Sequence, residues 1–167
     1  VIASPDSQMT AEPDTLIFVP VDDDWSLPRE VALVAVDDMV DEGPHLAAAS
    51  VTAFSTDIDY DGQGGLNMVP VAIADNDRAG VHVTESALTV VESIGGVAGE
   101  TYRVRLLSRP TAEVTVTATE TSAEPSFHLD PTVLVFTPDN WQVEQEIRLW
   151  AEMDNIDANN MNLVVDH

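Results

Sequence analysis

The sequence predicts an all-β protein built from antiparallel β-sandwich repeats, of which the chain contains about one and a half units. Apolar and polar residues alternate with a period of two in many segments, as in residues 101–106 and 113–119. Glycine, proline and aspartate separate these segments, and no segment has a helical period. One passage of the chain also occurs twice, which sets the size of the unit.

The repeated passage begins with a short apolar run that ends in proline. Residues 16–20 lead to Trp25 and then to residues 35–38, and residues 134–138 lead to Trp141 and then to residues 151–154. The copies lie about 116 to 118 residues apart, which is the size of one β-sandwich domain. We therefore expect residues 1–77 to be the C-terminal part of one unit and residues 78–167 to be the N-terminal part of the next, as in a window cut from a tandem array.

Strands are expected where apolar runs lie between turn signals, and the boundary between units is expected in the polar run 75–80. In the first unit the expected strands are residues 16–19, 30–36, 49–54 and 68–74, and in the second they are residues 81–84, 88–91, 101–106, 113–119, 133–136 and 146–151.

The composition excludes some partners and favours others. Thirty acidic residues against six basic ones give a formal net charge of −24, which repels nucleic acid and anionic membrane surfaces. No run of 18 apolar residues is present, so we expect no membrane insertion. There is no cysteine, and extracellular domains without disulfides commonly use metal ions instead. These features predict an acidic, extracellular or cell-surface protein that binds Ca²⁺.

Several short passages resemble the Calx-β superfamily, in particular the tandem repeats of large bacterial surface and adhesin proteins. They are residues 36–43, 55–62, 73–77, 90–95, 102–106 and 134–141, and they occur in the family's order once the chain is divided into two partial units. The resemblance implies an immunoglobulin-like sandwich of seven strands that often binds calcium at one end.

The resemblance also implies a set of calcium ligands, all of them acidic residues in loops. They are Asp37, Asp38, Glu42, Asp75, Asp77, Glu92 and Asp154. Calcium takes six to eight oxygen ligands, and converging carboxylates repel one another without a cation, so binding would contribute to folding. The second unit has Met153 in place of Asp37 and Ala158 in place of Glu42, so its site is expected to be the weaker one. The family often has an aspartate before its fourth strand. In this chain the corresponding region, around His128, has no aspartate at that position.

Three other features have a structural explanation beside a functional one. Residues 57–62 match the first half of an EF-hand loop, but Met68 at its twelfth position cannot supply a carboxylate, so a polar turn is favoured. Residues 22–24 form an acidic cluster that is an insertion relative to the other copy, which favours a solvated loop. Trp25 and Trp141 occupy matching positions, which favours packing against a sheet over stacking on a sugar.

Catalytic motifs are not found. The four histidines have no zinc-site spacing, there is no nucleophile elbow or phosphate loop, and thirty acidic residues produce carboxylate pairs by chance. We therefore expect no enzyme activity.

The expected function is that of a non-catalytic, calcium-stabilised structural or adhesive repeat. Partial units leave open sheet edges, which neighbouring repeats or other protein chains are expected to complete by strand pairing. Two alternatives remain: a subunit of a larger extracellular assembly, and an accessory module of a large extracellular enzyme.

Overall fold

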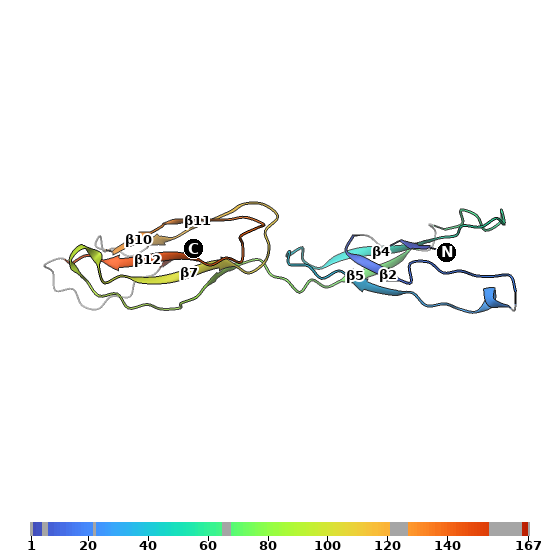
Figure 1. The fold of residues 1–167 in the computed structure, drawn as a ribbon, viewed down its shortest axis with the longest axis horizontal. Coiled ribbons are helices and arrows are strands. Elements are labelled where there is room, and N and C mark those ends of the chain that lie inside the picture. The colour runs from blue at the N-terminus through green and yellow to red at the C-terminus, as the bar shows by residue number, and fades with distance from the viewer. Residues whose placement is uncertain are drawn as a thin grey trace. The chain divides into compact units, whose positions relative to one another are not determined.

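The computed structural model describes residues 2–4, 7–21, 23–64, 68–120, 127–153 and 165–166 and divides the chain into two compact units (Figure 1). The first unit contains residues 1–38 and 42–76, and the second contains residues 39–41 and 77–167. Every strand pair is antiparallel, and the helical segments among the described residues are two 3₁₀ turns, η1 (Asp24–Ser26) and η2 (Ile94–Gly96). The prediction of an all-β, antiparallel fold is therefore confirmed. The observed division after Asn76 lies next to the predicted boundary.

The second unit contains a four-stranded sheet in the order β10-β12-β7-β6 and a pair of strands, β11-β8. The bounds of the sheet strands are β6 (Val81–Val83), β7 (Glu100–Leu106), β10 (Phe127–Asp130) and β12 (Gln145–Ala151). The pair consists of β8 (Val114–Thr117) and β11 (Val133–Phe136), and a further short pair joins β9 (Thr119–Glu120) to β13 (Val165–Asp166).

One hydrophobic core lies between the sheets of the second unit. Because side chains alternate along a strand, every second residue of β7, β12 and β11 points inward. Val104, Ile147 and Phe136, one from each of these strands, are fully buried. The rest of the buried cluster is Tyr102, Leu106, Val116, Ala118, Phe127, Leu134 and Leu149. Residues of both sheets share this core, which is the two-layered packing of a β-sandwich.

The first unit has the same kind of strands but a smaller core. One sheet has the order β1-β4-β5, with β1 (Ile2–Ser4), β4 (His45–Thr52) and β5 (Val69–Ile73). The other consists of β2 (Met9–Glu12) and β3 (Ala32–Ala35). The buried apolar residues described here are Met9, Ala47, Ala49 and Ile73, and Leu33 and Val71 pack against them.

The repeated passage forms the same antiparallel strand pair in both units. In the first unit Met9 pairs with Ala35 and Glu12 with Ala32. In the second, Phe127 pairs with Ala151 and Asp130 with Arg148. The two pairings are in the same register once the first strands are matched with an offset of about 118 residues and the second strands with an offset of about 116. A cis peptide bond to proline follows the first strand of each pair.

Two of the predicted strands do not form. Residues 16–19 lie outside any strand, although their counterpart 133–136 is β11. β11 pairs with β8, whereas among the described residues no strand of the first unit pairs with residues 16–19. Residues 88–91 also form no strand, but Val90 packs against the core, so the apolar pattern there reflects packing without ladder pairing.

The two matching tryptophans differ in burial. Trp141 is partly buried and packs against the core of the second unit, as predicted, whereas Trp25 lies in η1 and is 64% exposed. The prediction that Trp25 packs against a sheet is therefore wrong for the chain as described.

Alkaline pH should destabilise the second unit through Tyr102. Burial raises the pKa of the Tyr102 hydroxyl, since the phenolate is poorly solvated in the core. The folded state then holds this proton more tightly than the unfolded state, so the contribution is complete below about pH 10 and is lost as the pH rises further. We expect the loss of stability above about pH 10 to be smaller in Tyr102→Phe, as measured by urea unfolding at pH 8 to 11. An unchanged pH profile in the variant would assign the loss to other groups.

Candidate functional site

The candidate site in the first unit is organised by the carboxylate of Asp75. Asp75 lies two residues after β5, and its Oδ2 accepts hydrogen bonds from the backbone N–H groups of Glu42 and Gly43, both at 2.7 Å. Gly43 has φ 68°, in the left-handed region that glycine adopts without strain. This turn presents two consecutive N–H groups, and the carboxylate fixes the loop before β4 to the end of β5.

Two further contacts bring predicted ligands to the same loops. The Asn76 side-chain amide donates to Asp37 Oδ1 at 3.1 Å, and the Gln8 amide donates to Glu42 Oε1 at 2.6 Å. Asp37 follows β3, Glu42 precedes β4 and Asp75 follows β5, so three predicted ligands lie in loops that these hydrogen bonds connect. Asp38, the fourth, is exposed beside Asp37.

These loops have donors suited to calcium but do not form a coordination shell. All four side chains offer hard carboxylate oxygens, which calcium prefers. Among the described residues, however, no group of three or more acidic or histidine side chains is arranged to hold a metal ion. The reason is visible in the hydrogen bonds, because Asp37 and Asp75 direct oxygens at N–H donors of the protein. A bound ion would have to use the remaining lone pairs or turn these carboxylates.

The other predicted ligands belong to the second unit. Asp77, expected with the first unit, falls in the second, and Asp154 lies outside the described residues. The backbone places Glu92 beside the end of β12, because the Ser93 N–H donates to the Ala151 carbonyl and the Met153 N–H donates to the Ser93 carbonyl, both at 3.2 Å. Glu92 therefore lies near Met153, which occupies the position of Asp37 in the second unit.

Sequence reasoning missed two residues that organise these loops. Asn76 is not among the predicted ligands, yet its amide joins Asp37 to the end of the first unit. Asp41 was not named as a site residue, and its Oδ2 accepts the Ala79 N–H at 2.6 Å inside the second unit. The sequence signal for both was present, since an amide or a carboxylate at a turn commonly bonds to a nearby backbone or side chain.

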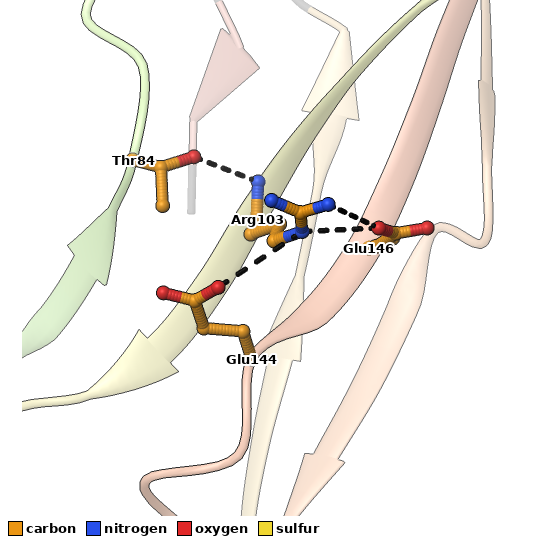
Figure 2. Close-up of polar contacts among 4 residues, drawn as sticks. All are labelled: Thr84, Arg103, Glu144 and Glu146. Carbon is orange, nitrogen blue, oxygen red and sulfur yellow. Dashed lines mark hydrogen bonds and ion pairs between the residues drawn. The ribbon is translucent and has the colours of Figure 1, made fainter.

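A surface ion-pair cluster links β7 and β12 of the second unit (Figure 2). Arg103 Nη2 lies 2.8 Å from Glu146 Oε1, and its Nε lies 3.9 Å from Glu144 Oε2. The hydrogen bonds that Arg103 donates to Glu146, together with the charge of that carboxylate, raise the pKa of the Arg103 guanidinium. The Thr84 hydroxyl accepts the backbone N–H of Arg103 at 3.0 Å. This cluster fixes neighbouring strands and contains no pair of groups suited to acid–base chemistry.

A hollow of about 420 Å³ also lies in the second unit. Apolar residues such as Val40, Leu106 and Pro110 form much of its lining, with Asp41 and Arg109 among the charged members. The Asp41 carboxylate accepts the Ala79 N–H, and the Arg109 backbone N–H donates to the Met39 carbonyl, so both groups are engaged within the second unit.

Comparisons with protein-family models, with curated proteins and with solved structures found no match to this chain. In the part of the chain that the structure describes, no helix is long and apolar enough to cross a membrane. The function is therefore argued from the residues and their arrangement.

Replacing Asp75 should weaken the first unit even without calcium. Asp75→Ala removes the acceptor of two backbone N–H groups, and hydrogen bonds to a charged group contribute about 1.5–3 kcal/mol each when shielded from water. Since Glu42 is exposed, we expect a total loss of about 2 kcal/mol in the free energy of unfolding, measured with urea in the presence of a chelator. Asp59→Ala removes the same charge from an exposed turn and should change stability by less than about 0.5 kcal/mol. Equal losses in the two variants would contradict the role of Asp75.

Proposed function

We propose that this chain is a non-catalytic, calcium-stabilised structural or adhesive repeat module of a secreted or cell-surface bacterial protein, with Calx-β-like, immunoglobulin-like sandwich units. The observation that carries the proposal is that β2–β3 and β10–β12 form the same antiparallel strand pair in the same register, one in each unit. Repetition of one supersecondary unit along a chain is typical of spacers and extended binding surfaces. A catalytic site does not require such repetition.

Calcium is proposed for the loops that follow β3 and β5 and precede β4. The donors in the first unit are Asp37, Asp38, Glu42 and Asp75, and those of a weaker second site are Asp77, Glu92 and Asp154. The net charge of −24 supports cation binding, because self-repulsion of the compact chain decreases when an ion is bound. The absence of cysteine supports a stabilising role for the ion, since no disulfide can supply it.

Calorimetric titration of the chelator-treated chain with calcium tests this proposal. We expect saturable calcium binding that magnesium does not reproduce. Asp37→Ala should weaken the calcium affinity by at least about tenfold, because it removes one charged ligand. Asp14→Ala, which removes an acidic residue from an exposed bend of the first unit, should leave binding within about twofold. Absence of calcium binding, or equal effects of the two substitutions, would contradict the calcium role.

A second candidate function is a subunit of a larger extracellular assembly that is completed by strand pairing. It is favoured by the large apolar side chains that the first unit exposes, such as Phe18 and Trp25. An accessory module of an extracellular enzyme is compatible with the same surface, and no observation in the described residues favours it over the others.

A further inference from the structure

A loop of the first unit exposes three large apolar side chains. Residues 53–64 continue beyond the end of β4 (Figure 1). Within this loop Phe54 is 66% exposed, Ile58 is 86% exposed and Tyr60 is 64% exposed. None of the three is among the described residues that form the core of the first unit or pack against it. Large apolar side chains that gather at one place on a surface commonly mark an interaction site.

The loop is closed and shaped by its own backbone hydrogen bonds. At its base the Ala53 N–H donates to the Gln63 carbonyl at 2.7 Å, and the Gly62 N–H donates to the Ala53 carbonyl at 3.0 Å. Near its tip two consecutive N–H groups donate to the Asp57 carbonyl, at 3.1 and 3.0 Å. A compact loop whose ends lie close together is frequently a functional one.

Carboxylates of the same loop also accept hydrogen bonds from its backbone. Asp61 Oδ1 accepts the Ser55 N–H at 3.1 Å, and Asp57 Oδ1 accepts the Asp59 N–H at 3.0 Å. The Ser55 hydroxyl accepts the Asp57 N–H at 3.0 Å. The shape of the loop therefore depends on polar contacts, and replacing its apolar side chains with polar ones would leave every one of these bonds in place.

The tip of this loop is a different surface from the sheet edges. Residues 53–64 lie between β4 and β5, which pair with each other in antiparallel register. A strand added beside either sheet would extend that sheet sideways. It would not cover side chains that lie on a loop beyond the strand ends, so the exposure of the tip calls for another kind of partner.

The loop is acidic as well as apolar. Residues 57–61 alternate strictly between aspartate and a large apolar residue, and all five are exposed. The chain has no basic residue between Arg29 and Arg78. A complementary partner must therefore supply positive charge together with apolar contact area.

We propose that residues 53–63 bind a segment of a partner protein that carries both large apolar and basic side chains. Its apolar side chains contact Ile58 and Tyr60, and its basic side chains pair with the aspartates or lie over the Tyr60 ring. Because the loop is already fixed, little conformational entropy is lost when it binds. A sugar fits less well, since Ile58, the most exposed of the three, offers neither a hydrogen bond nor a ring for stacking.

This inference rests on the proposed adhesive role and names the surface and the chemistry of its partner. A second copy of this chain does not have that chemistry. Its net charge is −24, so two copies repel each other. Two of its six arginines are also paired with carboxylates, Arg29 with Asp24 and Arg103 with Glu146.

The direct test is titration of the full chain with fluorescent synthetic peptides, in the presence of a chelator. One peptide alternates leucine with arginine, a second has glutamate in place of arginine, and a third has serine in place of leucine. Salt at physiological strength screens the general attraction between a basic peptide and an acidic chain. We expect the leucine–arginine peptide to bind at least about tenfold more tightly than either of the others.

Two substitutions remove apolar contact from the loop but keep its charge and its backbone hydrogen bonds. Ile58→Ser and Tyr60→Ser should each weaken binding of the leucine–arginine peptide by at least about fivefold. Leu46→Ser is the matched control, because Leu46 lies in β4 and is 80% exposed. It should change binding by less than about twofold. All three variants should keep the Tm of the unmodified chain to within about 3 °C.

Tight binding of the leucine–arginine peptide that the loop variants lose and Leu46→Ser retains supports the inference. The inference is overturned if no peptide binds, if all three bind equally, or if Leu46→Ser acts like the loop variants. A larger fall in Tm in the loop variants would also overturn it, because their side chains would then serve packing. So would self-association of the unmodified chain that Ile58→Ser abolishes, seen by sedimentation, because the occupant would be a second copy. The chelator separates these outcomes from those of the calcium proposal.

Discussion

Phe136→Ala is expected to lower the free energy of unfolding of the second unit by about 3–5 kcal/mol. Phe136 is 0% exposed and lies between the two sheets of this unit, so removing its ring leaves a cavity that the neighbouring strands cannot fill. Phe18→Ala is the matched control, because Phe18 is the counterpart of Phe136 in the repeat but is 37% exposed. We expect it to cost about 1 kcal/mol or less.

Amide exchange, used to monitor unfolding by urea, distinguishes the stabilities of the two units, because it reports on each segment separately. Faster exchange should be confined to the second unit in Phe136→Ala. Similar losses in the two variants would contradict the account, because they would mean that Phe18 lies in a core of comparable size.

Gly96→Ala is expected to destabilise the second unit by about 2–4 kcal/mol. Gly96 has φ 63°, which L-residues adopt at a cost, and a Cβ added there would overlap the indole ring of Trp150. Trp150 cannot move freely, because it stacks on His128 with ring centroids 5.3 Å apart and lies under the Arg148 guanidinium at 5.0 Å. The substitution therefore adds overpacking to backbone strain.

Gly95→Ala measures the cost of the backbone strain alone. Gly95 has φ 66°, but a Cβ added there would meet nothing within 4 Å, so the expected cost is about 1 kcal/mol. Thermal unfolding of both variants measures the difference. If the two variants lose the same free energy of unfolding, the contact of the added Cβ with Trp150 contributes nothing to the loss in Gly96→Ala.

Local sequence patterns predicted the strands that have a partner within the chain. Residues 101–106 alternate strictly and residues 146–149 alternate as well, and these segments pair in β7 and β12. Residues 16–19 have an equally good pattern but form no strand, because a strand needs a partner as well as a propensity. The burial of Trp25 was mispredicted because its counterpart Trp141 packs against the large core of the second unit, whereas the core of the first unit is smaller and Trp25 is not among the residues packed against it.

The candidate site could be predicted only in part. The repeat and the resemblance placed Asp37, Glu42 and Asp75 in neighbouring loops, and hydrogen bonds connect those loops in the first unit. The sequence could not predict that Asp75 accepts two backbone N–H groups, because that depends on the turn at Gly43. Whether these carboxylates also bind calcium remains a prediction.

Thermal unfolding with millimolar calcium, with a chelator and with magnesium tests the central claim most directly. A ligand at about 100 times its dissociation constant adds about 2.7 kcal/mol per site, which for a unit of this size raises Tm by about 10 °C. We predict a rise of this order with calcium, little change with magnesium, and a smaller rise in Asp37→Ala. The same Tm in calcium and in chelator would contradict the account, and would leave the acidic loops as solvated turns in a module held together by strand pairing.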